Sequence, residues 1–118
     1  MPVRSSSSPV LKWPNAATVD RAVRRWADRF VGARSDVCAV GYFGSYARGD
    51  WGVGSDLDLL VIVDRAEDPF ERRAAGWDTT GLPVPTELLV YTKDEWERLR
   101  GGRFHGTVMR DAVWVYSR

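Results

Sequence analysis

Residues 44–58 read GSYARGDWGVGSDLD and join two short apolar runs, VCAVGYF at 37–43 and LDLLVIV at 57–63. Each run has the length of one strand and is bounded by glycine or polar residues, which is the pattern of a strand buried in a sheet. The glycines at 49, 52 and 54 make the link between the runs a tight polar loop. This stretch therefore predicts two strands and a connecting loop at the centre of the fold.

Further elements are expected on both sides of this centre. Asn15 can cap a helix, and the residues after it repeat apolar side chains at helical spacing until Gly32. Thr92 and Glu95 form a capping box that opens another helix. The predicted elements are helices over 15–32, 46–48, 69–77 and 92–100, and strands over 37–43, 57–63, 83–91 and 112–116. This order predicts an α/β (α+β) domain in which helices flank a mixed β-sheet.

The composition narrows the class of protein. A length of 118 residues allows one domain and is short for two. The single cysteine cannot form an intramolecular disulfide. The net charge of +1 argues against a nucleic-acid partner. No run of residues approaches the roughly 20 apolar residues that a membrane span needs. We therefore expect a cytoplasmic protein without a membrane partner. It would have a flexible, serine- and proline-rich segment at 1–14 and one folded domain at 15–118.

The acidic residues are concentrated in the middle of the chain. Residues 36–97 hold thirteen of the 16 acidic residues, whereas the segments on either side are basic. This distribution has two readings, solvated faces or a cation site in the middle of the chain.

Asp56 and Asp58 stand two residues apart at the start of the second apolar run. Because side chains alternate along a strand, both should point to the same face, with Cα atoms roughly 6.5–7 Å apart. Two like charges at about 6 Å cost roughly 2–3 kcal/mol at an effective dielectric constant near 20. A divalent cation between them reverses the sign of the interaction, and carboxylate oxygens are the ligands that Mg²⁺ prefers. A solvated strand end is the alternative for a bare Asp-x-Asp pair.

A glycine–serine bend precedes this pair. Gly44 and Ser45 follow the first predicted strand and precede the helical turn at 46–48. Glycine lets the backbone approach an anion closely, and the amide groups at the start of the turn, with the Ser45 hydroxyl, could seat a phosphate. An ordinary tight turn is the alternative. Together, the bend and the aspartate pair favour metal-assisted attack on a nucleotide phosphate.

Glu87 is the best candidate for a third carboxylate. It lies in the apolar run TELLVY, and a neighbouring strand could place it beside Asp56 and Asp58. Its role there would be that of a metal ligand, or of a general base toward an acceptor hydroxyl. The alternative is a glutamate at the start of a strand that points to water.

These residues carry a family resemblance. Gly44-Ser45, ten further residues and Asp56-x-Asp58 resemble the signature of the DNA polymerase beta-like nucleotidyltransferase superfamily. The likeness is greatest to the minimal nucleotidyltransferases, or MNT domains, and the surrounding letters FGSYARGD, GSDLDLLV and YTKDEW agree with it. The resemblance covers roughly residues 17–116.

The resemblance implies a mixed sheet flanked by helices and a Mg²⁺-dependent transfer of a nucleoside monophosphate, AMP from ATP, to an acceptor hydroxyl. By position, Asp56 and Asp58 would hold the metal together with Glu87, whereas Gly44 and Ser45 would hold the triphosphate. Arg48 would contact a phosphate or serve as a surface arginine. The third acid of the family is more often an aspartate, so Glu87 is a departure from the pattern.

The resemblance also implies a partner. Minimal members pair with a separate HEPN-domain protein in modules that resemble toxin–antitoxin pairs, and the MNT protein is the antitoxin that transfers AMP to a tyrosine of the toxin. Two alternatives stay open. The chain could neutralise its partner by contact alone, without catalysis, or it could modify a small molecule at a site completed by a homodimer.

Some aromatic residues and the single histidine also invite interpretation. Trp51 lies in the glycine loop, where it could cover a nucleotide base, dock a partner or anchor the loop. Trp13 and Trp77 are candidates for a protein interface. No second histidine supports a metal-ligand role for His105, so we expect it to be structural or exposed.

Overall fold

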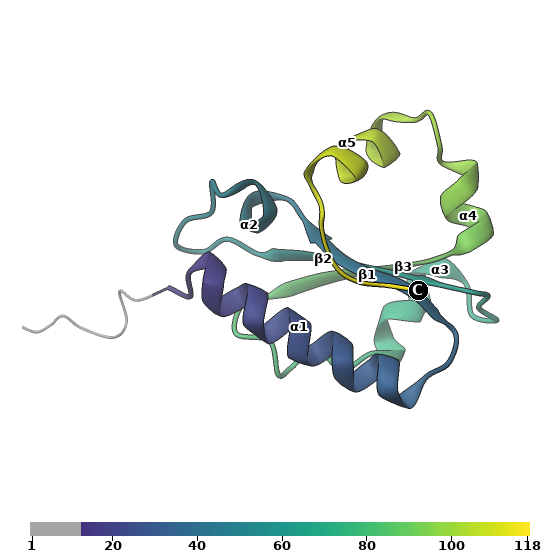
Figure 1. Cartoon of the computed structure of the whole chain (residues 1–118), viewed down its shortest axis with the longest axis horizontal. Coiled ribbons are helices and arrows are strands. Elements are labelled where there is room, and N and C mark those ends of the chain that lie inside the picture. Colours follow the sequence, from purple (N-terminus) through teal and green to yellow (C-terminus); the bar gives the residue numbers. More distant parts are fainter. Residues whose placement is uncertain (1–12) are drawn as a thin grey trace, which may run out of the picture.

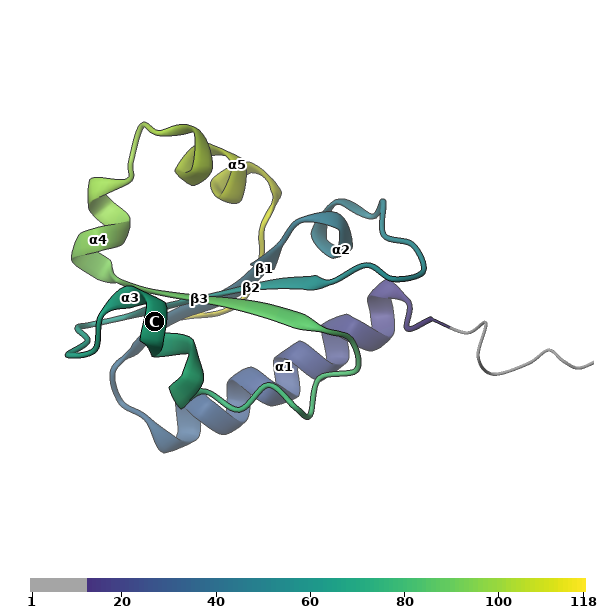
Figure 2. The ribbon, with the colours of Figure 1, turned by 180° about the vertical axis from the view of Figure 1, so that it is seen from behind.

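The computed structural model describes residues 13–118, which form three layers. Figure 1 shows α1 under one face of the sheet and α4 and α5 over the other face, and Figure 2 shows the same layers from behind. The elements in chain order are α1 (Ala16–Ala33), β1 (Val37–Phe43), α2 (Ser45–Arg48), β2 (Leu57–Val63), α3 (Phe70–Arg73), the 3₁₀ helix η2 (Ala74–Gly76), β3 (Thr86–Thr92), α4 (Lys93–Arg98), α5 (Arg103–Asp111) and β4 (Val113–Ser117).

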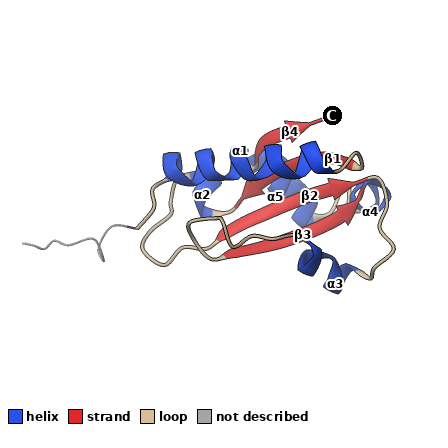
Figure 3. Cartoon of the chain, turned by 90° about the horizontal axis from the view of Figure 1, so that it is seen from below, coloured by secondary structure: helices blue, strands red, loops and turns tan. Residues whose placement is uncertain are grey.

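The sheet is mixed, as predicted. Its strand order is β3-β2-β1-β4, so β3 and β4 form the two edges (Figure 3). β1 runs antiparallel to both β2 and β4, whereas β2 runs parallel to β3. A parallel pair needs a crossover connection, and here α3, η2 and the loop after them provide it.

Helix α1 confirms the amphipathic pattern that the sequence predicts. The Asn15 side chain caps it by accepting a hydrogen bond from the Thr18 amide at 2.9 Å. Val19, Val23 and Trp26 are buried in the larger apolar cluster, between the helix and the sheet. No helix within residues 13–118 is both long and apolar enough to cross a membrane.

The opposite face of the sheet is covered by α4 and by α5, and the prediction lacked α5. Gly106 interrupts the helical signal of this short segment, and burial of one side of the helix compensates for that weakness. The apolar cluster under these helices is built on Leu60, Ile62, Trp96 and Val108. His105 takes a structural position, because it is 8% exposed and its ring lies 4.7 Å from that of Trp96.

The start of one strand and the position of one aromatic residue depart clearly from the sequence-based expectations. β3 begins at Thr86, three residues later than predicted, and the Pro83–Pro85 stretch remains in the connection. Proline has no amide to donate, so it does not continue a paired strand. Trp77 is 5% exposed and packs in the core, so its proposed role in a protein interface is wrong.

The predicted flexible segment, 1–14, falls mostly on residues 1–12, which lie outside the described residues. Its last two residues contact the folded domain. Trp13 packs against the core, and the Pro14 carbonyl accepts a hydrogen bond from the Tyr46 hydroxyl at 2.8 Å.

Gly41 lies in the middle of β1, where Trp114 of β4 packs across it. A Cβ atom at residue 41 would lie 2.7 Å from Cε3 of Trp114 and 3.0 Å from the Val113 carbonyl oxygen. The indole ring is held in a packed cluster and the carbonyl belongs to the backbone, so displacing either of them costs free energy. Glycine at this position therefore allows the indole to pack against the sheet.

We predict that Gly41→Ala lowers the free energy of unfolding by about 1–3 kcal/mol, because the added methyl group overpacks the Trp114 contact. Gly106→Ala is the matched control, since residue 106 lies inside α5 with open space around it. It should raise the free energy of unfolding by about 0.5–1 kcal/mol, because alanine is the better helix former. Urea denaturation measures both, and a Gly41→Ala variant as stable as the wild type would contradict the packing described.

Candidate functional site

The bend after β1 depends on Gly44. Its φ angle is 78°, a left-handed value that favours glycine, and a Cβ atom there would overlap Oδ2 of Asp58. The Gly44 carbonyl accepts hydrogen bonds from the amides of Ala47 and Arg48, at 3.1 and 3.0 Å. The preceding amides, those of Ser45 and Tyr46, stand at the start of the turn, where a helix leaves its first donors without intrahelical partners.

Asp58 and Glu87 lie beside each other in a row that crosses the sheet. In the strand register, Asp58 of β2 pairs with Phe43 of β1 on one side and with Glu87 of β3 on the other. Directly paired residues point their side chains to the same face. The row begins next to the Gly44 bend, so the two halves of the sequence signature meet at one end of the sheet.

The pKa of the Asp58 carboxyl group is raised, because its surroundings disfavour the charged form. Burial raises its pKa first, and the charges of Glu87 and Asp56 raise it further, whereas Arg48 acts in the opposite direction. No hydrogen bond contributes to lowering this pKa. Asp56 and Glu87 are exposed, and Asp58 is half-buried between them and the bend. Repulsion among the three carboxylates is therefore part of this end of the sheet.

Arg48 lies at the edge of this group. It is exposed and forms an ion pair with Asp50, with 3.1 Å between Nε and Oδ2. Asp50, with smaller contributions from Asp111 and Asp58, raises the pKa of Arg48. Asp111, at the end of α5, is a further charge near Arg48 that the sequence does not single out. The two residues are more than 60 positions apart in the sequence, and only the packing of α5 over the sheet brings them close.

The loop between the two halves of the signature is held by its own side chains. Trp51 stacks on Tyr46, with ring centroids 5.5 Å apart and the planes 9° from parallel, and it packs against the α1 side of the core. The Ser55 hydroxyl accepts a hydrogen bond from the Gly52 amide at 2.8 Å. Of the three roles open for Trp51, these contacts favour that of a loop anchor.

The three carboxylates do not form a closed metal site. Among residues 13–118, no three His, Cys, Asp or Glu side chains are arranged to hold a metal ion by themselves. The structure brings Asp58 next to Glu87 and leaves Asp56 within electrostatic reach. The chemistry of the donors fits a hard divalent cation, because all three are carboxylates and their mutual repulsion is what a cation would relieve.

Two surface hollows lie at the other end of the sheet, away from this site. One is lined by charged side chains around Trp77 and Val90, and the other lies beside Asp64 and Arg118. The carboxylate row belongs to neither hollow.

Most of the chain matches a known domain family. The family model described as "nucleotidyltransferase domain" matches residues 24–108. Among curated proteins, none matches the sequence. The chain is similar to the crystal structure of a putative nucleotidyltransferase from Sulfolobus solfataricus, with a TM-score of 0.64 and 19% identity over 87% of this chain and 84% of that chain. A toxin–antitoxin crystal structure with AMP-PNP has a TM-score of 0.49 and 15% identity, over 80% and 73% of the two chains.

Burial of the Asp58 carboxylate, together with repulsion from Glu87 and Asp56, predicts an unusual response to mutation. Because the pKa of the folded state lies above that of the unfolded state, the stability of the wild type falls as pH rises through this interval. Asp58→Asn should therefore raise the free energy of unfolding at pH 7 by about 0.2–1 kcal/mol, the scale of a cross-strand charge pair. This gain should shrink as the pH is lowered.

The matched control is Asp36→Asn, whose carboxylate has the opposite environment. Arg34 donates two hydrogen bonds to Asp36, at 3.0 and 2.9 Å, and they lower its pKa. Asp36→Asn should lower the free energy of unfolding at pH 7, with the loss fading as the pH falls. Urea denaturation at several pH values measures both variants, and a destabilised Asp58→Asn variant would refute the repulsion.

Proposed function

The chain belongs to the nucleotidyltransferase domain family, and on that premise we propose that it transfers a nucleoside monophosphate, AMP from ATP, to an acceptor hydroxyl. The observation that carries this proposal is the strand register, which sets Asp58 beside Glu87 and against the Gly44 bend. Carboxylates for a cation and free amides for a phosphate thereby meet at one end of one sheet.

Asp56, Asp58 and Glu87 are the residues proposed to hold Mg²⁺. Their support is the donor chemistry and the raised pKa of Asp58, which marks a place where negative charge is concentrated without compensation. Because the three do not enclose an ion by themselves, water and phosphate oxygens would complete the coordination, as is usual for Mg²⁺. When bound, the ion supplies charge neutralisation for the phosphate oxygens.

Gly44, Ser45 and Arg48 are the residues proposed to hold the triphosphate. Gly44 has no side chain to keep the phosphate from the backbone, and Ser45, the first residue of α2, offers an amide at the start of the turn and a hydroxyl as a further donor. Arg48 contributes a positive charge near Asp58, although it must leave or share its ion pair with Asp50 to reach a phosphate.

The proposed reaction is a displacement at the α-phosphorus of ATP. The acceptor oxygen forms a new bond to that phosphorus, the bond from the phosphorus to the bridging oxygen breaks, and pyrophosphate leaves. The proton of the acceptor hydroxyl moves to the Glu87 carboxylate, which lies at the outer, exposed end of the row.

The proposed acceptor is a hydroxyl on a separate HEPN-type protein, which gives the chain an antitoxin role in the cytoplasm. Its support is the resemblance of the Gly44–Asp58 signature to minimal nucleotidyltransferases. The exposure of Glu87 agrees with it, because an acceptor as large as a protein needs a site open to the surface.

The first test is nucleotide binding in the presence of Mg²⁺. Asp58→Asn should weaken the binding of ATP at least tenfold, about 1.4 kcal/mol, because it removes a proposed metal ligand. Asp94→Asn is the matched control, since Asp94 is an exposed carboxylate in the first turn of α4, away from the row, and it should leave the affinity unchanged. Isothermal titration calorimetry measures both, and equal affinities for all three proteins would rule out the proposed metal site.

A second candidate, neutralisation of the partner by contact alone, is favoured by Glu87, which stands where the family more often has an aspartate. The two candidates separate when the chain is mixed with a HEPN-type protein, Mg²⁺ and ATP. Catalysis predicts that the partner gains the mass of AMP, and that Asp56→Asn and Asp58→Asn lower the rate by about 100-fold or more. Inhibition of the partner without ATP and without added mass would instead support contact alone.

A further inference from the structure

The row of side chains that holds the proposed catalytic carboxylates ends at an open sheet edge. It runs from Phe43 through Asp58 to Glu87, and β3, which carries Glu87, is an edge strand. The next position in this row would belong to a strand added outside β3, about 4.8 Å away. Whatever occupies that position lies beside Glu87.

The backbone groups of β3 that face outward can be identified from its pairing with β2. The Leu57 amide donates to the Pro85 carbonyl at 2.8 Å, so the backbone of residue 85 points toward β2. The backbone N–H and C=O groups of successive residues point to alternate sides of a strand. The backbone groups of the odd-numbered residues of β3 therefore point toward β2, and those of the even-numbered residues point outward. The outward residues are Thr86, Leu88, Val90 and Thr92.

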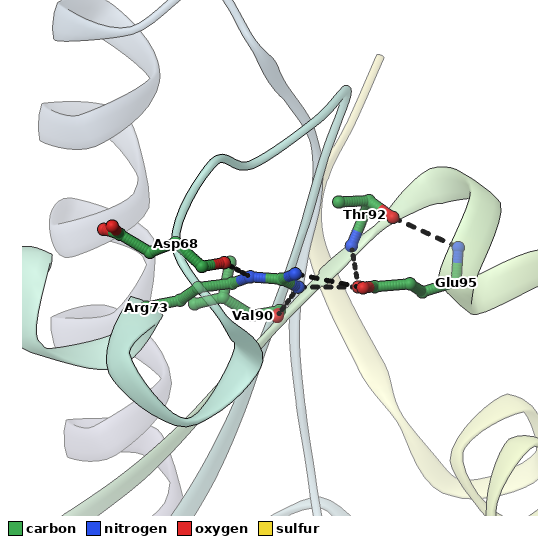
Figure 4. Close-up of polar contacts among 5 residues, drawn as sticks. All are labelled: Asp68, Arg73, Val90, Thr92 and Glu95. Carbon is green, nitrogen blue, oxygen red and sulfur yellow. Dashed lines mark hydrogen bonds and ion pairs between the residues drawn. The ribbon is translucent and has the colours of Figure 1, made fainter.

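One end of this edge is already closed by an ion pair. Figure 4 shows Arg73 of α3 donating to the outward carbonyl of Val90, at 3.1 Å, while Glu95 of α4 accepts from the outward amide of Thr92, at 2.9 Å. Arg73 and Glu95 also bind each other through two hydrogen bonds, at 2.6 and 3.0 Å. The Arg73 side chain is 9% exposed, so this arrangement is part of the packed structure.

The ion pair occupies the place of one residue of a neighbouring strand. In a parallel ladder, a residue donates its amide to one carbonyl and accepts from the amide two residues further on. Arg73 and Glu95 supply this donor and this acceptor at Val90 and Thr92. A strand added to β3 must therefore end before it reaches this pair.

The other end of the edge, residues 86–88, has no such closure. Among the described residues, no side chain bonds to the outward backbone groups of Thr86 and Leu88. This free part carries Glu87, which lies beside Asp58, and Asp56 adds to the negative charge at Asp58, whereas the arginine that acts on Asp58 is already paired with Asp50. A basic segment complements this surface.

We propose that residues 86–88 pair with an extended, basic segment of a protein acceptor, which adds a fifth strand to the sheet and sets a hydroxyl side chain beside Glu87. The inference rests on the proposed function for the role of the hydroxyl, but the pairing itself needs only the edge. Main-chain hydrogen bonds give such strand addition its affinity, and side chains on one face give it specificity. The residue opposite Glu87 shares its face, toward Asp58.

The test uses the whole chain and a defined probe, without nucleotide or metal. The probe is the capped peptide acetyl-Lys-Val-Thr-Val-Lys-amide, which combines strand-forming residues, a hydroxyl and basic ends. On addition of the peptide, hydrogen exchange of the Leu88 amide, followed by NMR, should slow at least tenfold, and exchange along β4 should not change. The same peptide with alternate amides N-methylated should have no effect, because it cannot complete the ladder.

Unchanged exchange at Leu88 at millimolar peptide would overturn the proposal, as would an equal effect of the methylated peptide or protection at β4 instead. Since the experiment contains no ATP, its failure leaves the proposed reaction untouched.

The closing role of the ion pair has its own matched variants. Arg73→Met frees the Val90 carbonyl and should raise the affinity for the peptide several-fold, whereas Arg72→Met, at the exposed neighbouring residue, should not change it. Equal affinities for a folded Arg73→Met variant and the wild type would refute that role.

Discussion

The contact between Gly44 and Asp58 is the constraint on which the site depends. The Asp58 carboxylate occupies the place that a Cβ atom at position 44 would take, so a larger residue there would have to displace it, and the left-handed φ of 78° independently favours glycine. The antiparallel pairing of Phe43 with Asp58 brings the end of β1 against the start of β2, so the start of α2 and a strand with carboxylates lie at one end of the sheet.

The sheet holds together charges that repel one another. Asp58 and Glu87 are neighbours because β2 and β3 pair without a break, from Leu57 with Thr86 to Val63 with Thr92. Asp56 directly precedes β2. The apolar residues of β2 are buried on both faces, by α1 on one side and by α4 and α5 on the other. Burial of this strand fixes the carboxylates in spite of the raised pKa of Asp58, and the unrelieved repulsion is what makes a cation a suitable ligand.

One end of the β3 edge is closed by side chains, and the other end, which carries Glu87, is open. An exposed edge invites pairing with other chains, and proteins commonly cover it. Here the Arg73–Glu95 pair covers the end near α4, while the end beside Glu87 stays open. The closed part of the strand, at Val90 and Thr92, thus leaves open the part that carries Glu87, where the proposed acceptor would pair.

The sequence by itself determined the parts of the fold that depend on local patterns. The two central apolar runs became β1 and β2 with the predicted bounds, and Asn15 and the Thr92–Glu95 box cap helices as expected. Helix α5 was missed, because Gly106 weakens its local signal and its stability comes from packing on the sheet. Only the tertiary structure decided that Glu87 lies beside Asp58, that Asp111 comes near Arg48, and that one end of β3 is closed. The reason is physical: local spacing fixes which way a side chain points along its own strand, but strand order, register and edge contacts arise from pairings between distant segments.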